Sequence, residues 1–262
     1  MTVTPAQLLS HSEGRTMVLT ISNPEHRNAL GPELYAAGVE ALNAADSNPE
    51  VRSVVITGAG STFCAGGNLQ RLLENRKQPP ALQAASVEGL HGWIEAIRSF
   101  PKPVIAAVEG AAAGAGFSLA LACDFIVAAE DALFVMAYSS VALSPDGGST
   151  WSLSRALPRQ LVSELLMCGE RIRAPRLQQL GLVNRVTPAG AALAQALALA
   201  ESLNQRAPNV LASIKELMND APQVPLDRQL ASERDQFVRN LHHANGGIGI
   251  EAFLAKRKPD YS

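Results

Sequence analysis

The chain has 262 residues, of which 47% are hydrophobic and 18% are charged, and its formal net charge is −2. This length suits one large domain, or one domain with a small helical addition, and the composition is that of an ordinary soluble globular protein. The near balance of 22 Lys and Arg against 24 Asp and Glu argues against broad nucleic-acid binding, which needs a basic face.

Strands and helices alternate through the first half of the chain. Apolar runs rich in β-branched residues predict strands at 16–21, 51–57, 104–108, 125–128 and 133–136. Helices are predicted at 33–45, 88–98 and 117–123, with a further helix start at 69–75. The segment 78–87 holds two prolines and scattered small residues, and we predict a mobile loop there. The alternation indicates an α/β core with crossover connections.

Helical patterns dominate from residue 149 onward, apart from a short predicted strand at 183–186. Further helices are predicted at 191–203, 209–219, 226–241 and 248–256. We therefore divide the chain into a core, 1–200, and a C-terminal helical region, 201–262, that would serve as a lid or in oligomerisation.

The cellular setting is predicted from the cysteines and from the longest apolar stretch. Three cysteines, an odd and small number, make a disulfide framework unexpected and fit a reducing cytoplasm. The apolar stretch 104–129 is broken by Glu109, Asp124 and several glycines, so we expect no membrane span.

Two strand-to-helix turns, at 57–69 and 108–118, are built mainly of small residues. Small residues let a ligand approach the backbone, and free N–H groups at a helix start carry a partial positive charge. Two such turns facing each other can supply two donors to one oxygen that gains negative charge during a reaction.

Three other interpretations of the second turn remain open at this point. A dinucleotide site would need G-x-G-x-x-G/A, but Leu119 stands where the third small residue should be. The run 116–120 comes close to G-x-S-x-G, so Ser118 could be a nucleophile, with Asp146 and His242 or His243 following in the order of a catalytic triad. The small residues could also serve only close packing of a helix on a strand.

The motifs taken together resemble the crotonase family of enoyl-CoA hydratases and isomerases. The resemblance spans nearly the whole chain and rests on segments in a fixed order, namely 23–30, 63–69, 103–108, 114–116, 122–124, 145–148, 181–183 and 253–259. It implies a spiral of ββα units, a coenzyme A thioester as substrate, an oxyanion hole at the N–H groups of Ala65 and Ala115, and homotrimers that often pair into hexamers. No separate cofactor is implied, because coenzyme A is part of the substrate.

The resemblance also places the coenzyme. It implies that the backbone around Glu25, His26 and Arg27 lines the adenine, and that Lys256 of a neighbouring subunit approaches the phosphates. A lysine suits that position because coenzyme A carries several phosphate charges. The turn residues Ala65, Gly66, Gly67 and Asn68, together with Tyr138, complete the implied substrate site. Asn68 stands where the family usually has aspartate, and either residue can cap the following helix.

The sequence departs from the hydratases of the family at the catalytic acids. Those hydratases use two glutamates, and the corresponding positions here are Ser118 and Tyr138. Neither can act as a carboxylate base near neutral pH, since tyrosine ordinarily titrates near pH ~10. The remaining acid in the right segment is Asp146, in a loop where some family isomerases carry their catalytic acid. An aspartate between proline and two glycines could also be a plain turn residue.

We therefore predict an isomerase-type enzyme in which Asp146 moves a proton and Ala65 and Ala115 hold the enolate oxygen. The alternatives are a conventional enoyl-CoA hydratase, an oxepin-CoA hydrolase-like enzyme, a serine hydrolase using Ser118, and a non-catalytic acyl-CoA-binding relative. Members of the family that act in phenylacetate breakdown are the most similar in these loops. The five histidines show no metal-ligand spacing, so we expect no metal.

Overall fold

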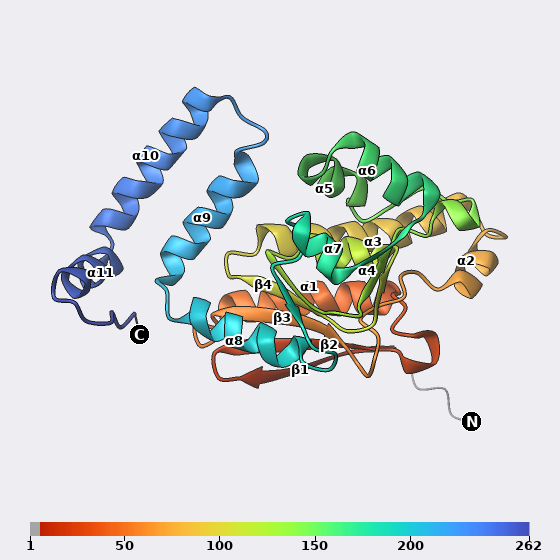
Figure 1. The fold of residues 1–262 in the computed structure, drawn as a ribbon, viewed down its shortest axis with the longest axis horizontal. Coiled ribbons are helices and arrows are strands. Elements are labelled where there is room, and N and C mark those ends of the chain that lie inside the picture. Colours follow the sequence, from red (N-terminus) through yellow and green to blue (C-terminus); the bar gives the residue numbers. More distant parts are fainter. Residues whose placement is uncertain (1–5, 262) are drawn as a thin grey trace.

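The fold centres on a six-stranded sheet (Figure 1). The computed structural model describes residues 6–261, so residues 1–5 of the predicted core lie outside it. The strands stand in the order β1-β2-β3-β4-β6-β9, and only the pair β1–β2 is antiparallel. Their bounds are β1 Gln7–Glu13, β2 Thr16–Ser22, β3 Ser53–Gly58, β4 Val104–Val108, β6 Phe125–Ala129 and β9 Arg185–Thr187. The carboxyl ends of the parallel strands therefore meet at one edge.

A smaller three-stranded sheet stands beside the first one. It has the order β5-β7-β8, with bounds β5 Ala111–Ala113, β7 Leu133–Val135 and β8 Arg171–Arg173. Consecutive units of the chain add one strand to each sheet and then a helix, as in β4–β5–α4, where α4 is Ala115–Ala122. A single bridge between Cys64 and Ala112 extends the smaller sheet toward the preceding unit. This repetition is the predicted spiral of ββα units.

Helices cover both faces of the large sheet. On one face α1 (Pro32–Ser47) packs against α3 (Pro80–Ser99), and on the other α8 (Ala192–Asn204) lies over β3, β4 and β6. Side chains of β3 alternate between the two faces of the sheet, since Val54 and Ile56 join the main core while Val55 lies under α8. The remaining short helices are η1 Pro24–His26, α2 Leu69–Asn75, η2 Ser139–Val141, α5 Ser149–Ala156, α6 Arg159–Ser163, η3 Glu164–Cys168 and α7 Ala174–Gln179.

The last three helices stand apart from the sheet at one end of the molecule (Figure 1). They are α9 Pro208–Asp220, α10 Leu226–His242 and α11 Ala244–Leu254. Helix α8 runs past residue 200 to Asn204, so the nearest break between helices is at 205–207. The division of the chain into two regions stays a prediction, and it is better placed at that break.

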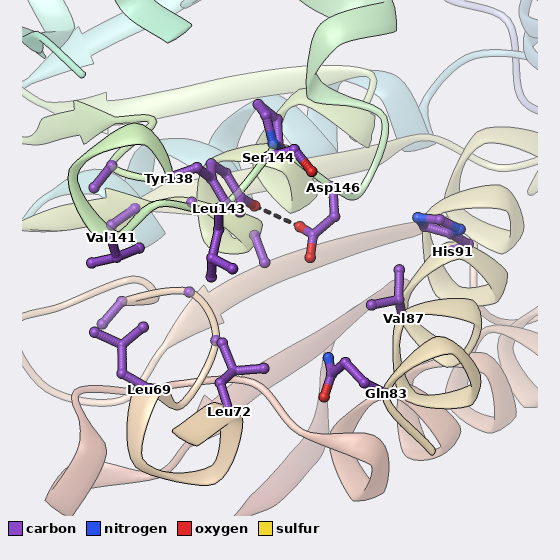
Figure 2. Close-up of a pocket in the computed structure, with 18 residues that line it drawn as sticks. Leu69, Leu72, Gln83, Val87, His91, Tyr138, Val141, Leu143, Ser144 and Asp146 are labelled. Carbon is purple, nitrogen blue, oxygen red and sulfur yellow. Dashed lines mark hydrogen bonds between the residues drawn. The ribbon is translucent and has the colours of Figure 1, made fainter. Parts of the chain in front are cut away.

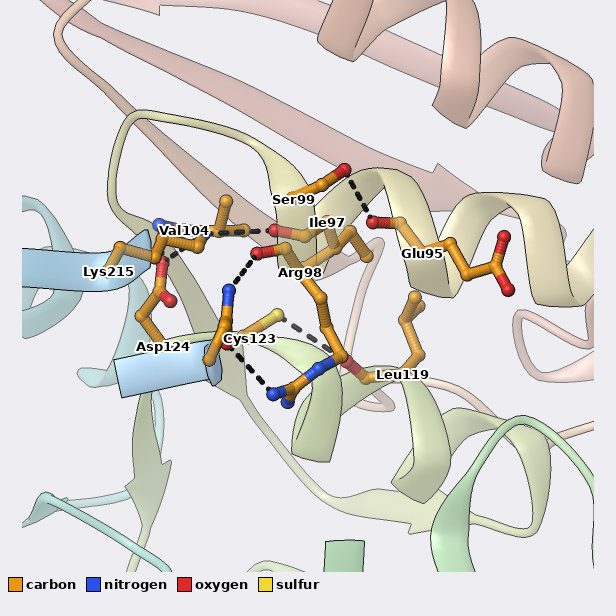
Figure 3. A network of polar contacts seen from close by, with 10 residues as sticks. Glu95, Ile97, Arg98, Ser99, Val104, Leu119, Cys123, Asp124 and Lys215 are labelled. Carbon is orange, nitrogen blue, oxygen red and sulfur yellow. Dashed lines mark hydrogen bonds and ion pairs between the residues drawn. The ribbon is translucent and has the colours of Figure 1, made fainter. Parts of the chain in front are cut away.

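Polar contacts join α9 to the core (Figure 3). Lys215 Nζ lies 2.7 Å from Asp124 Oδ2 and donates to the carbonyl of Ile97 at 2.9 Å. The same Asp124 oxygen accepts from the N–H of Val104 at 2.8 Å. Burial raises the pKa of Asp124, and the charge of Lys215 opposes this shift. The contact therefore fixes α9 to the start of β4 and to the end of α3.

Several predicted elements need correction. The segment 78–87 is not a mobile loop, because α3 begins at Pro80 and continues to Ser99. Proline fits the first turn of a helix, where its missing N–H would have no partner in any case, so the prolines here open a helix. Strands β1, β5 and β8 were not predicted. Within residues 6–261, none of the helices combines the length and the apolar character needed to cross a bilayer.

Candidate active site

A cavity of about 430 Å³ opens at the carboxyl-end edge of the large sheet (Figure 2). It is bounded by the turns that follow β3 and β4, by α2 and α3, and by the loop between β7 and α5. Most of its wall is apolar, with Leu69, Leu72, Val87, Ala137, Val141 and Leu143. The polar side chains on the wall are those of Gln83, His91, Tyr138, Ser144 and Asp146.

Backbone hydrogen bonds hold the two small-residue turns together. Cys64 donates to the carbonyl of Ala111 at 2.9 Å, and Ala113 donates to the carbonyl of Cys64 at the same distance. A Cβ atom added to Gly66 would lie 2.6 Å from the carbonyl oxygen of Ala113, and one added to Gly116 would lie 2.5 Å from that of Cys64. The small residues are therefore required by the close approach of one turn to the other.

The N–H groups of these turns differ in whether they are available to a ligand. Ala115 is the first residue of α4, so its N–H has no partner within the helix. The N–H of Ala65 instead donates to the carbonyl of Arg27 at 3.0 Å. Ala65 is therefore wrong as the predicted second donor, because a neighbouring chain segment already occupies its N–H. In the described part of the chain the N–H of Gly67, two residues on, has no acceptor. Gly67 and Ala115 are the pair of open donors.

Among the described residues that line the cavity, the one acidic side chain is held by a tyrosine. Tyr138 Oη donates to Asp146 Oδ1 at 2.5 Å, and the other carboxylate oxygen faces the cavity (Figure 2). Burial raises the pKa of Tyr138 above its ordinary value, and the charge of Asp146 raises it further. Tyr138 therefore keeps its proton and acts as a donor. This fixed pair brings together two of the residues predicted for the site.

Ser118 does not have the surroundings of a nucleophile. Its side chain is buried on α4, and Oγ donates to the main-chain carbonyls of Asp146, at 3.0 Å, and Gly114, at 3.3 Å. His242 ends α10, which stands with the C-terminal helices at one end of the molecule, away from α4 in the core (Figure 1). The predicted order of a catalytic triad is therefore not realised in space, and Ser118 supports the Asp146 loop.

Asn68, which was predicted for the substrate site, and the nearby Cys64 both have structural roles. The Asn68 side chain accepts from the N–H groups of Gln70 and Arg71, at 3.0 and 3.1 Å, and so caps α2. Cys64 is buried, and burial raises the pKa of its thiol to about 12. A thiol with so high a pKa is a packing group rather than a reactive one.

The residues predicted to bind the coenzyme lie outside the cavity wall. Glu25, His26 and Arg27 are exposed in and after the short helix η1, next to the turn that carries Gly67. Lys256 follows α11, and α11 lies far from α2 in the same chain (Figure 1). The structure therefore brings the first three residues near the open donors and leaves Lys256 distant from this chain's own cavity.

Two cavity residues, Gln83 and His91, were not predicted. They lie on α3 with Val87 between them, and the three are spaced by four residues along one face of the helix. The spacing is visible in the sequence. A spacing of four residues places side chains on one face only in a helix, and the segment 78–87 was predicted to be a loop.

Comparison with known proteins agrees with this geometry. A profile of the enoyl-CoA hydratase/isomerase family matches residues 12–262. Among characterised proteins, a 1,2-epoxyphenylacetyl-CoA isomerase of Escherichia coli is 36% identical over 97% of this chain and 98% of its own length. A 2,3-dehydroadipyl-CoA hydratase of the same bacterium is 35% identical over 98% of each chain.

A solved structure described as an enoyl-CoA hydratase from Polaromonas sp. JS666 superposes with a TM-score of 0.97. It is 70% identical and the match covers 97% of this chain and 99% of that one. The family match, the shared fold and the paired backbone donors lead to one conclusion. The chain is an enzyme of the enoyl-CoA hydratase/isomerase family, with the crotonase fold.

Proposed function

We propose that the enzyme isomerises an unsaturated acyl-CoA thioester, with Asp146 as the group that moves the proton. The observation that carries this proposal is that Asp146 is the one carboxylate among the described residues that line the cavity. Hydratases of the family use two carboxylates to add water, and Ser118 and Tyr138 replace them here. One carboxylate is sufficient for a reaction that removes a proton and returns it elsewhere.

The proposed reaction starts from a 3-enoyl thioester. Asp146 takes a proton from C2, and the electron pair moves onto the thioester oxygen to give a dienolate. The N–H groups of Gly67 and Ala115 hold that oxygen as its charge develops. Asp146 then gives the same proton to C4, the electron pair returns from the oxygen, and the double bond lies between C2 and C3. No water is consumed, and Asp146 ends as it began.

The Tyr138–Asp146 hydrogen bond supports this role. It occupies one carboxylate oxygen and leaves the other toward the cavity (Figure 2). A base fixed in this way needs no rearrangement before it meets the substrate. The names of the two characterised relatives do not decide the reaction, since one is an isomerase and the other a hydratase at nearly equal identity; the solved structure at 70% identity is described as an enoyl-CoA hydratase.

The substitution Asp146→Asn tests the proposal, with Asp131→Asn as a control at an exposed position outside the cavity. We expect isomerisation of 3-hexenoyl-CoA to fall by about 10²- to 10⁴-fold in the first variant, as is typical for loss of an acid–base group. Hydration of crotonyl-CoA and conversion of an epoxidised aromatic acyl-CoA are measured beside it. Undiminished isomerisation by Asp146→Asn would refute the role of Asp146. Strong crotonyl-CoA hydration by the wild type would favour a hydratase instead.

Coenzyme A is proposed to bind beside the open donors, along residues 25–27. This segment is held rigidly, because the buried Asn28 side chain donates to the carbonyls of Ala59 and Thr62 at 2.9 and 2.6 Å. The carbonyl of Arg27 also accepts from Ala65. Glu25, His26 and Arg27 are thus exposed on a support fixed to the oxyanion turn. Lys256 would serve the coenzyme of a neighbouring subunit.

A homotrimer, able to pair into a hexamer, is the proposed assembly. Helices α10 and α11 expose large apolar side chains, among them Phe237, Phe253 and Leu254. Apolar surface of this extent marks an interface with another chain. Sedimentation equilibrium is expected to give about three times the mass of one chain, and a monomer at micromolar concentration would contradict this. A cytoplasmic location is proposed as well, supported by the three free cysteines.

A further inference from the structure

The outer wall of the cavity carries two polar side chains that the proposed proton transfer does not use. Gln83 and His91 lie on one face of α3, two helical turns apart, with Val87 between them. They lie on the side of the cavity that faces Asp146, apart from Leu69 and Tyr138 (Figure 2). The walls around them, including Leu69 and Leu72, are apolar. Polar groups in such surroundings mark a place where a ligand presents a polar atom.

The amide of Gln83 is oriented by a neighbour. Its Oε1 accepts from Asn75 Nδ2 at 2.8 Å, so the oxygen is used on the side of α2. The amide nitrogen lies on the side of Asp146 (Figure 2). Gln83 therefore offers a hydrogen-bond donor to whatever occupies the cavity.

The ring of His91 has an acidic neighbour on the same helix. Nδ1 lies 3.7 Å from Glu88 Oε2, one turn earlier on the exposed side of α3. One ring nitrogen lies on the side of Asp146 (Figure 2), so the imidazole presents a polar atom to the cavity. An imidazole nitrogen can accept from a hydroxyl group, or donate to an oxygen in the tautomer that carries the proton on it.

The charge around this pair restricts what it can bind. Asp146 and Glu88 are both acidic, and no lysine or arginine is among the described residues that line the cavity. A carboxylate on the acyl chain would meet negative charge with no lysine or arginine on the described cavity wall to offset it. An uncharged oxygen meets a donor from Gln83 and a donor or acceptor from His91.

We propose that Gln83 and His91 bind an uncharged oxygen on the acyl group, remote from the thioester. The enzyme would then prefer acyl-CoA thioesters with a hydroxyl, carbonyl or ether oxygen over plain alkenyl chains of the same length. The proposal rests on the proposed function, because it requires the acyl group to occupy this cavity. A net hydrogen bond is worth about 0.5–1.5 kcal/mol, so two of them correspond to roughly a tenfold preference.

The test compares kcat/KM for matched substrates, namely 3-hexenoyl-CoA, its 5-hydroxy and 6-hydroxy derivatives, and the equivalent with a terminal carboxylate. We expect the wild type to favour one hydroxylated thioester over the plain chain by about tenfold and not to favour the carboxylate. Gln83→Leu and His91→Phe should each reduce that ratio, and the double variant should abolish it. Gln70→Leu, an exposed glutamine on α2 outside the cavity wall, is the matched control and should keep the ratio.

Three results would overturn the proposal. They are equal wild-type kcat/KM for the plain and hydroxylated thioesters, a preference that survives in the double variant, and a preference for the carboxylate. If none of the thioesters is turned over, the proposed function has failed. The proposed role of Gln83 and His91 is then tested by measuring ligand affinity instead of turnover. The dissociation constants of saturated hexanoyl-CoA and hydroxyhexanoyl-CoA are then compared in the same variants. Equal wild-type affinities for the two would refute it.

Discussion

The cavity has two walls that differ in the groups they present to a ligand. One presents backbone N–H groups, and the other presents side chains. The first, which we call the backbone wall, consists of the turns after β3 and β4. Its N–H groups of Gly67 and Ala115 have no acceptor among the described residues and are proposed to hold the thioester oxygen. The second, the side-chain wall, consists of one face of α3 and the loop that carries Tyr138 and Asp146. It acts through side chains.

The two walls are fixed by different means. The backbone wall is held by main-chain hydrogen bonds between Cys64 and the strand β5, and by glycines that no larger residue can replace. The side-chain wall depends on single contacts, such as the one between Tyr138 and Asp146. A single substitution can therefore change the reaction or the acyl preference on the second wall while the first continues to hold the thioester.

Apart from Asp146→Asn, the largest effect is expected from removing one donor of the backbone wall by Ala115→Pro. Ala115 is the first residue of α4, where proline fits, and the preceding Gly114 has no Cβ to clash with the ring. The rate of isomerisation should fall by about 10²- to 10³-fold. Single-turnover kinetics with 3-hexenoyl-CoA measure it.

The control for this variant is Ala115→Gly, which keeps the N–H and should retain most of the activity. Circular dichroism and thermal melting of the proline variant establish whether it folds. A folded Ala115→Pro enzyme with a nearly normal rate would show that the backbone wall does not stabilise the enolate, and the contrast between the walls would fail.

A smaller effect is expected on the side-chain wall from Tyr138→Phe. Hydrogen bonds to a charged group contribute about 1.5–3 kcal/mol, so loss of this one should lower kcat by roughly tenfold or more. The raised pKa of Tyr138 means that the hydroxyl stays protonated above pH ~10, where a free tyrosine ionises. Wild-type kcat/KM should therefore show no decline due to this group between pH 8 and about pH 10.

The pH profile of the variant separates positioning from simple packing. A decline of wild-type activity in that range which disappears in Tyr138→Phe would show that Tyr138 ionises there, against the expected direction of its pKa shift. A variant with unchanged kcat would mean that Asp146 does not need this hydrogen bond.

The sequence was informative where local patterns determine the structure. β-branched runs located β3 and β4, and the predicted bounds of β4 and of the start of α2 coincide with the observed ones. The small residues of the two turns, and the acid in the Asp146 loop, were recognisable because their chemistry follows from residue type. Strand β5, Ala111–Ala113, was not, since alanine does not favour strands and its pairing with β7 depends on distant residues.

The rest of the site depends on contacts that no local pattern records. In the β3–α2 turn, the N–H of Ala65 is not open because it donates to the carbonyl of Arg27, which belongs to another part of the chain. Gln83 and His91 reach the cavity only because α3 begins at Pro80 and directs the helix face that carries them toward the cavity. The sequence thus indicated the two turns, while the N–H groups that are open and the outer wall of the cavity required the structure.

The smallest effect is expected where the two walls meet, at Asn68. Its side chain caps α2, whose residues Leu69 and Leu72 line the cavity. Asn68→Ala should lower the free energy of unfolding by about 1 kcal/mol, measured by urea denaturation, whereas Asn68→Asp should preserve the cap and favour the helix N-terminus. Turnover should change little in either variant. A loss of activity above about 100-fold in Asn68→Ala, at unchanged stability, would instead place Asn68 in direct contact with the substrate and move it from the support of α2 into the backbone wall.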